Sequence, residues 1–217
     1  MIIPSTIRAV LFDAVGTLIY PDPPVAEVYC REGQKLGSRY TATEIGPRFR
    51  TAIARHHQGG TTSEELERER WRRIVYDVID DVDDPSHQLL TSLWKHFGAA
   101  SSWRLYGDVA PLWHELISRG YLLGIASNFD SRLRAICLGH PPLDRCQHIF
   151  VSSEIGYPKP ELQFYRAVED HLSLPAEQIL LIGDDYAADV SGPQEAGWEA
   201  RWLRRDQGET LDQAVFR

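Results

Sequence analysis

The chain has 217 residues, of which 43% are hydrophobic, and it carries a formal net charge of -8. This length suffices for one α/β domain with an inserted subdomain, and six tryptophans together with the hydrophobic share are typical of a folded globular protein. The negative charge argues against a general nucleic-acid-binding surface and leaves small molecules and proteins as candidate partners.

The first predicted element is a buried β-strand over residues 7–13. Its apolar run ends in Asp13, and a turn containing Gly16 and Thr17 follows. Open parallel α/β sheets carry their chemistry at the carboxyl ends of their strands. Asp13 is therefore a candidate nucleophile or metal ligand.

A helical segment follows the first strand. The proline-rich stretch 20–24 cannot continue a helix or a central strand and predicts a hinge, after which residues 25–103 have helical patterns throughout. Two capping boxes, at residues 41–44 and 62–65, mark helix starts, and Asp84 before Pro85 predicts a third. Apolar residues between 71 and 97 recur at helical spacing, so we expect an inserted helical bundle.

From residue 107 onward the pattern changes to alternating helices and strands, which is typical of a parallel sheet covered on both faces. The remaining polar tail, residues 206–217, is expected to be loosely held. The predicted helices cover residues 109–120, 131–138, 161–171 and 188–196, and the predicted strands cover residues 121–126, 149–152, 179–182 and 200–203.

Polar residues that suit phosphate and metal chemistry follow these later strands. Ser127 and Asn128 can hold phosphoryl oxygens at a helix N-terminus, and the prolines on either side of Lys159 aim its side chain. Carboxylates clustered beside Asp13 would repel one another unless a cation lay between them, and Mg²⁺ is the natural choice for oxygen ligands. The clustered carboxylates are Asp184, Asp185 and Asp189.

Four stretches of the sequence, in this order and spread over nearly the whole chain, resemble the haloacid dehalogenase (HAD) superfamily of hydrolases. They are residues 10–18, 125–128, 157–160 and 181–185, with Asp189 beyond the last. The resemblance implies an α/β fold: a Rossmann-like, doubly wound parallel sheet core with an inserted α-helical bundle cap. It places the core at residues 1–20 and 104–217 and the cap at residues 21–103. In such proteins the cap closes over the site and selects the substrate.

The resemblance also implies roles for individual residues. Asp13 is the expected nucleophile, Ser127 and Asn128 bind phosphate, and Lys159 neutralises the nucleophile and the transferring group. The expected Mg²⁺ ligands are Asp13, the backbone carbonyl of Val15 and Asp184. Asp185 and Asp189 are expected in the outer shell, with Asp189 holding Lys159 as an alternative. For Asp185 and Asp189 a second interpretation, a negative charge that complements the dipole of the next helix, stays open.

Val15 departs from the pattern of HAD phosphatases, which carry an aspartate here as general acid and base. Val cannot supply that catalysis, which is typically worth about 10²–10⁴-fold in rate. A phosphohydrolase limited to good leaving groups, a dehalogenase-like carbon hydrolase and a non-catalytic binding protein are the alternatives. Asp184 favours the first, because a metal-free dehalogenase does not need this carboxylate. We therefore expect a Mg²⁺-dependent phosphohydrolase acting on a small phosphorylated metabolite.

The helical insertion offers several polar side chains as substrate contacts or proton donors. Its candidates are Arg48, Arg50, Arg55, His56 and His57, and the candidates near the first strand and the last helix are Tyr20, Asp22 and Tyr186. The sequence leaves monomer and homodimer open.

The cysteines and the N-terminus indicate the compartment. Cys30, Cys137 and Cys146 are odd in number and lack close-pair spacing, which favours reduced thiols over disulfides or a zinc site. The first five residues are too few for the apolar part of a signal peptide, and no apolar run approaches a membrane span. We expect a soluble cytoplasmic protein without a membrane or nucleic-acid partner.

Overall fold

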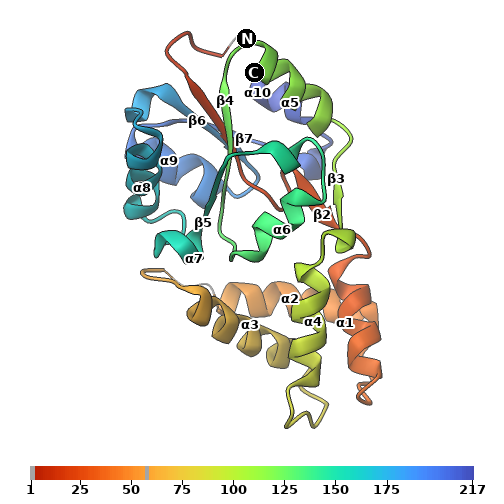
Figure 1. The fold of residues 1–217 in the computed structure, drawn as a ribbon. Coiled ribbons are helices and arrows are strands. Elements are labelled where there is room, and N and C mark those ends of the chain that lie inside the picture. Colours follow the sequence, from red (N-terminus) through yellow and green to blue (C-terminus); the bar gives the residue numbers. More distant parts are fainter. Residues whose placement is uncertain (1–2, 57–58) are drawn as a thin grey trace.

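The computed structural model describes residues 3–56 and 59–217 and centres on a five-stranded parallel sheet (Figure 1). The strand order is β5-β4-β1-β6-β7, so the first strand lies in the middle. The chain moves outward from β1 to one edge and then crosses to the other side, which creates a topological switch point at β1. The strands are β1 (Ala9–Phe12), β4 (Leu122–Ser127), β5 (His148–Val151), β6 (Ile179–Gly183) and β7 (Glu199–Trp202).

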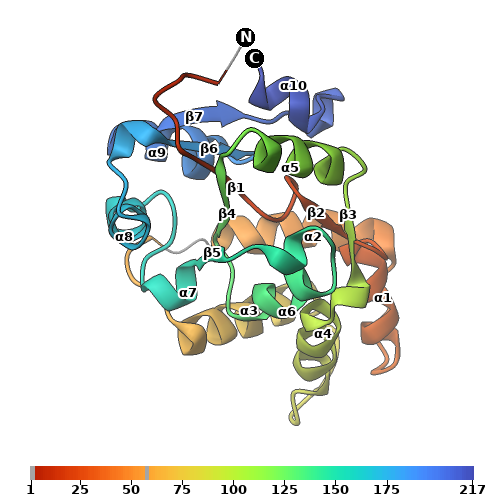
Figure 2. The same cartoon turned by 45° about the horizontal axis from the view of Figure 1, so that its top comes forward.

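Alternating side chains of β1 pack into two different apolar clusters, one on each face of the sheet. Val10 and Phe12 join one cluster, and Ala9 and Leu11 join the other, as the two-residue period of a strand requires. Helices cover both clusters (Figure 2), which confirms the predicted doubly wound fold. One cluster involves α5 (Val109–Ser118), α6 (Arg132–Leu138) and α10 (Leu211–Val215), and the other involves α8 (Leu162–Leu172) and α9 (Gly192–Ala196).

Four helices lie together beyond one end of the sheet, and we call them the helical layer (Figure 1). They enclose an apolar cluster of their own, which includes Tyr29, Ile45 and Ile74. Two short antiparallel strands connect this layer to the core, β2 (Ile19–Pro21) and β3 (Trp103–Leu105). The four helices are α1 (Val25–Gln34), α2 (Ala42–Arg55), α3 (Glu64–Val78) and α4 (Gln88–Gly98).

Two predicted helix starts in this layer are wrong in detail. The first capping box is present at Thr41 and Glu44. The N-cap residue of α3, however, is Ser63 and not Thr62, and the Ser63 hydroxyl accepts from the backbone N–H of Leu66. The second box fails because Thr62 donates instead to the buried Glu67.

The start of α4 also differs from the prediction. Asp84 is not its N-cap residue, because α4 begins at Gln88 after His87, which has a left-handed backbone. The Asp84 carboxylate nevertheless accepts from the backbone N–H groups of Gln88 and Leu89, at 2.9 and 2.8 Å. Asp84 therefore satisfies the first donors of the helix from four residues upstream.

The polar tail is more ordered than the sequence predicts. Its helix α10 begins with a capping box between Thr210 and Gln213 and buries Leu211, Ala214 and Val215 against the core. The predicted helix over residues 188–196 is a π-helical turn, Ala187–Ser191, that leads into α9. In α5, the apolar Ile117 is 54% exposed and does not face the core. Among the described residues no helix is long and apolar enough to span a membrane.

Candidate active site

Asp13 lies directly after the central strand, where the switch point of the sheet lies. Its backbone N–H donates to the carbonyl of Ile182 at 2.9 Å, which continues the pairing of β1 with β6. The side chain is 9% exposed. The register of β1 against its two neighbours brings Ser127, at the end of β4, and Asp184, after β6, to the same edge of the sheet.

Lys159 links Asp13 to a second carboxylate. Its Nζ donates to Asp13 Oδ1 at 2.9 Å, to Asp189 Oδ1 at 2.5 Å and to the carbonyl of Ala126 at 2.6 Å. Lys159 is only 1% exposed, so this ammonium group would be costly to bury without these acceptors. Lys159 therefore holds Asp13 in a fixed position.

Asn128 positions the backbone of Lys159. Asn128 Nδ2 donates to the Lys159 carbonyl at 2.8 Å, and the Lys159 N–H donates to Asn128 Oδ1 at 2.7 Å. This reciprocal pair joins the loop after β4 to the segment before α8. Ser127 is buried, and its side chain opposes the rise in the pKa of Asp13 that burial causes. Asn128 thus braces the site through the backbone of Lys159.

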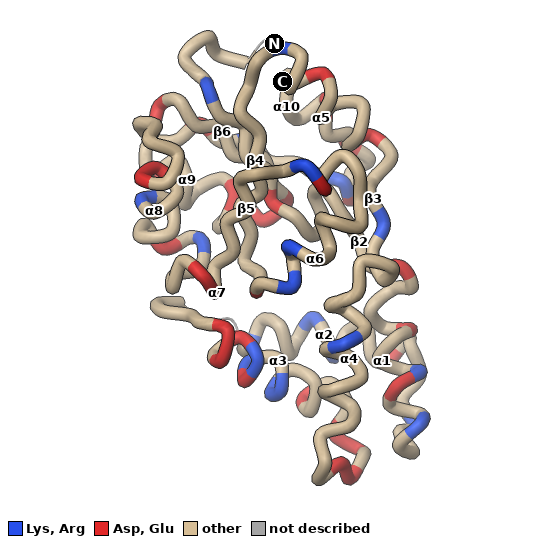
Figure 3. Tube along the Cα trace, viewed as in Figure 1, with Lys and Arg blue, Asp and Glu red and all other residues tan. Residues whose placement is uncertain are grey.

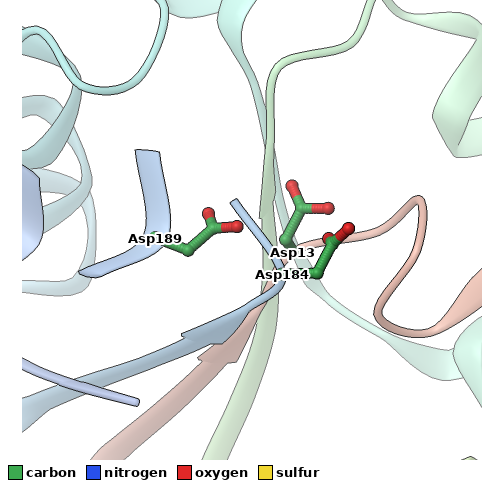
Figure 4. A group of neighbouring side chains, drawn as sticks. All are labelled: Asp13, Asp184 and Asp189. Carbon is green, nitrogen blue, oxygen red and sulfur yellow. The ribbon is translucent and has the colours of Figure 1, made fainter. Parts of the chain in front are cut away.

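Three carboxylates converge at this edge of the sheet. Oxygen atoms of Asp13, Asp184 and Asp189 lie within 4.8 Å of one another, and Figure 4 shows Asp189 pointing toward the other two. Thr17, which is fully buried, donates to Asp184 Oδ1 at 3.1 Å. Gly16 has a φ of +87°, and a side chain there would collide with the Asp184 carboxylate. The close approach of the Gly16 backbone therefore leaves room for Asp184 beside Asp13.

The electrostatics of the cluster follow from burial and from charges of like sign. Burial raises the pKa of Asp13, with a further contribution from Asp184 and opposition from Lys159. Desolvation, reinforced by Asp189, raises the pKa of Asp184 to about 6, although this residue stays exposed at the surface. Burial also opposes the charge of Lys159, but Asp13 and Asp189 outweigh it and raise its pKa. Lys159 thus forms ion pairs with Asp13 and Asp189, beside the third carboxylate, Asp184.

Asp185 and Asp189 lie close in sequence but in different surroundings. Asp189 is buried and holds Lys159, and its Oδ2 accepts from the Asp185 N–H at 3.0 Å. Asp185 is exposed, and its Oδ1 accepts from the N–H groups of Ala187 and Ala188, both at 2.9 Å. Asp185 therefore stabilises the start of a helical turn and does not join the carboxylate cluster.

Val15 lines a cavity of about 320 Å³ between the core and the helical layer. Most of its lining is apolar or aromatic. Asn128 and Phe129 form part of the core side, and residues of all four layer helices form the opposite wall. The cavity thus begins at the residue where HAD phosphatases carry their general acid.

The basic residues suggested in the helical insertion are engaged elsewhere. Arg48 pairs with Asp80 at 2.8 Å. Arg55 and His56 both contact Asp77, at 2.9 and 2.7 Å. None of these three basic residues lines the cavity.

The other suggested groups that the structure describes are not part of the carboxylate cluster either. Arg50 does not line the cavity, and His57 lies outside the described residues. Near the core, Tyr20 packs on Tyr106, Asp22 pairs with Arg104, and Tyr186 packs on Trp202.

The buried thiols do not have the properties of nucleophiles. Burial raises the pKa of Cys137 to about 12 and that of Cys146 to about 11. All three cysteines are free. A thiol nucleophile needs a lowered pKa, so Cys137 and Cys146 are structural.

Sequence reasoning missed two residues that support the site from a distance. Thr17 holds Asp184, and the guanidinium of Arg205 donates to the Thr17 carbonyl at 3.1 and 2.7 Å. Thr17 could have been found from the Gly–Thr turn after Asp13. Arg205 gave no signal, because it is 188 residues away in the chain from its contact.

The fold and the cluster define a class of protein: an α/β protein with three converging carboxylates at the switch point of its parallel sheet. A family model described as haloacid dehalogenase-like hydrolase matches residues 7–197. The chain therefore belongs to the haloacid dehalogenase-like hydrolase family. Haloacid dehalogenase-like hydrolase domain-containing protein 3 of Danio rerio is 26% identical over 211 residues, covering 94% of this chain and 87% of the relative.

Solved structures with the same fold include both phosphatases and dehalogenases. A HAD phosphatase from Thermococcus onnurineus has a TM-score of 0.66 at 22% identity, covering 96% of this chain and 91% of that chain. A defluorinating L-2-haloacid dehalogenase has a TM-score of 0.74 at 19% identity, covering 94% and 85%. The HAD-hydrolase YfnB from Bacillus subtilis, solved with magnesium, has a TM-score of 0.69 at 22% identity, covering 94% and 91%. These likenesses show the fold.

Proposed function

We propose that this hydrolase is a Mg²⁺-dependent phosphohydrolase that cleaves a small phosphorylated metabolite through an aspartyl-phosphate on Asp13. The observation that carries the proposal is the contact of Lys159 with both Asp13 and Asp189, beside a third carboxylate, Asp184. A carboxylate at the switch point that an ammonium group holds in a fixed position is well placed to act as a nucleophile.

The reaction has two steps. In the first, an oxygen of Asp13 attacks phosphorus, the bond between phosphorus and the leaving oxygen breaks, and the leaving group departs with the electron pair. In the second, water attacks the aspartyl-phosphate, which releases inorganic phosphate and restores the Asp13 carboxylate, while the water proton passes to solvent. The covalent route splits one difficult displacement into two easier ones.

Lys159 and Ser127 stabilise the transferring group. Lys159 offsets the negative charge that a phosphoryl group brings beside Asp13, and its fixed position requires little reorganisation during the reaction. Ser127 is within hydrogen-bonding reach of Asp13, so its hydroxyl can donate to a phosphoryl oxygen there. Asn128 is fully engaged with Lys159, and we assign it a positioning role.

The donor set of the cluster fits Mg²⁺. Carboxylate and carbonyl oxygens are the ligands this ion prefers, and three carboxylates converge here beside the ammonium group of Lys159. Asp13, the carbonyl of Val15 and Asp184 would hold the ion, and Gly16 keeps the space beside Asp184 open. Bound there, Mg²⁺ would neutralise the charge of the substrate phosphate. We assign Asp189 to the second shell, through Lys159.

Val15 restricts the range of substrates. Because Val15 cannot protonate a leaving group, alkyl phosphates are expected to react slowly, and esters whose leaving group departs unprotonated are expected to react faster. A haloacid dehalogenase-like carbon hydrolase is the second candidate, since halide leaves without a proton. The three converging carboxylates favour the phosphohydrolase, because unneutralised charge beside Asp13 would be costly without a cation.

The test is hydrolysis of p-nitrophenyl phosphate and acetyl phosphate, with and without Mg²⁺, by the wild type and by Asp13→Asn. We expect Mg²⁺-dependent turnover that falls at least 10³-fold in the variant, because the nucleophile is removed. Thermal unfolding of Asp13→Asn serves as the folding control. Turnover that persists in Asp13→Asn would refute the mechanism, and release of halide from 2-haloacids without phosphatase activity would support the second candidate.

A further inference from the structure

The cavity beside Val15 has the size of a small-molecule site. Its volume of about 320 Å³ lies in the range of ligand pockets, roughly 300–1,000 Å³. It is about twice the roughly 150 Å³ apolar cavity that suffices to bind benzene. Two fused aromatic rings therefore fit within it.

Aromatic side chains dominate the wall that faces Val15. Tyr29 lies edge-on to Phe49, with ring centroids 5.4 Å apart, and Phe49 stacks on Trp71 at 6.3 Å. Rings packed in this way offer both edges and faces to a further ring. Trp103 closes the cavity near the core, edge-on to Phe129 at 6.0 Å.

The two cations that line the cavity are already neutralised. Arg132 forms a bidentate pair with Asp130, with both distances 2.7 Å, and its guanidinium lies 3.5 Å from the centre of the Trp94 ring. Arg70 donates to Glu67 at 3.2 Å and to a backbone carbonyl at 2.9 Å. A charged ligand group would have to compete with these acids, so the cavity suits an uncharged one.

Charged residues are numerous along the helical layer and in its loops. Figure 3 shows acidic and basic residues interspersed along α3, and acidic residues gathered in the loop between α3 and α4. That loop holds Asp80, Asp81, Asp83 and Asp84. The wall of the cavity thus differs in chemistry from the outer surface of the same helices.

We propose that the preferred substrates are phosphate monoesters of phenols, with the aromatic ring in this cavity and the phosphoryl group at Asp13. The inference rests on the proposed phosphohydrolase function. It unites two observations, the apolar cavity and the missing acid at Val15. A phenol ionises near pH 10, well below an aliphatic alcohol, so the phenoxide leaves without a proton donor and takes its proton from water afterwards.

The first experiment compares 1-naphthyl phosphate with phenyl phosphate, with Mg²⁺ present. Their leaving groups have similar acidity, so a difference in KM reports the fit of the second ring. We expect a KM at least fivefold lower for the naphthyl ester, because the added ring buries apolar surface. Equal KM values would overturn the inference.

The second experiment narrows the cavity. Ile53 lines it from α2, and Ile53→Trp should lower kcat/KM for 1-naphthyl phosphate at least tenfold while leaving acetyl phosphate turnover within twofold. Thr51→Trp adds the same ring on the exposed side of α2 and should change neither. Unchanged naphthyl phosphate kinetics in Ile53→Trp would contradict the proposal.

Acetyl phosphate distinguishes failure of the aryl assignment from failure of the proposed phosphohydrolase function. Turnover of acetyl phosphate without any preference for the naphthyl ester overturns the aryl assignment and leaves the phosphohydrolase intact. Absence of turnover with acetyl phosphate and with every phosphate ester overturns both. If Ile53→Trp does not fold, the fluorescence of the cavity tryptophans in Asp13→Asn provides the test. 1-Naphthyl phosphate should quench this fluorescence, and inorganic phosphate, the control, should not. Absence of quenching by 1-naphthyl phosphate would overturn the inference.

Discussion

At the scale of single residues, Val15 determines what the site can do. Val15 lines an apolar cavity, although it follows Asp13, the proposed nucleophile, by two positions. Val15→Asp should raise kcat/KM for alkyl phosphates by about 10²–10⁴-fold and change acetyl phosphate turnover little, because only the former need a proton donor. The measurement is phosphate release from glycerol phosphates. Val15→Asn, which cannot donate as an acid, is the matched control, and an equal gain in that variant would contradict the argument.

Lys159 makes the site costly to disturb. Lys159→Met leaves Asp13 and Asp189 buried without their cation, so we expect the free energy of unfolding to fall by about 3–5 kcal/mol. Lys35 is the control, because its side chain is 62% exposed and Arg31 also pairs with its partner Glu32, so Lys35→Met should cost about 1 kcal/mol or less. Urea denaturation measures both, and equal losses would show that burial of the Lys159 pairs is not decisive.

Most side chains of the cluster could be predicted from the sequence, because each follows an apolar strand and parallel strands end at one edge. Asp13, Asp184 and Lys159 come together for that reason. The neutralisation of Arg132 by Asp130 and the support of Thr17 by Arg205 could not be predicted, since side-chain pairing across the fold leaves no periodic signal in the chain.

At the scale of elements, α3 attaches the helical layer to the core. Glu64, the first residue of α3, accepts from the N–H and hydroxyl of Ser131 at 2.9 and 3.0 Å and from the hydroxyl of Ser153 at 2.5 Å. Burial opposes the charge of Glu64, but these donors outweigh it and lower its pKa below 4.5. The contact therefore stabilises the protein above about pH 4.5 and is lost as the carboxylate takes up a proton below it.

Glu64→Gln should weaken this attachment. We expect amide exchange in α3 to accelerate severalfold at pH 7, because hydrogen bonds to a charged acceptor are typically worth about 1.5–3 kcal/mol. The difference in unfolding free energy from the wild type should shrink as the pH falls toward 4. Glu65→Gln, at the exposed neighbouring position, should leave exchange unchanged. A difference that persists at pH 3.5 would show that the charge of Glu64 is not responsible.

Element types were predictable wherever the apolar period was long, as in β6 and α8. The helix starts at Ser63 and His87 were missed because several Ser, Thr and Asp side chains compete for the same backbone donors, and only the folded geometry selects among them.

At the scale of the whole molecule, the C-terminal segment supports the active-site loop. Arg205 forms a bidentate pair with Asp108, with both distances 3.0 Å, and its guanidinium lies 3.8 Å from the centre of the Tyr106 ring. It also reaches the Thr17 carbonyl. The tail was predicted to be loose because it is polar, and the tertiary contacts that stabilise a helix as short as α10 do not show in the sequence.

Arg205→Ala should destabilise the protein and impair the site together. We expect a loss on the order of 3 kcal/mol in unfolding free energy, because Asp108 and the Thr17 carbonyl lose their donors. Phosphate release should slow as Thr17 loosens its hold on Asp184. Arg166→Ala removes an exposed ion pair with Glu169 and should do neither. A loss of stability with unchanged kcat and KM would show that Arg205 does not support the proposed active site.

The pairing of β2 with β3 places the departure and return of the chain side by side, with Pro21 opposite Trp103. The segment between β2 and β3 therefore leaves and re-enters the core at one place, as a long surface loop would. Loop-closure entropy grows slowly, by only about 0.6 kcal/mol for each doubling of length. The core can thus accept a longer, shorter or foreign set of helices at this junction without moving Asp13. An exchange of the helical layer at this junction is therefore expected to leave the carboxylate cluster in place.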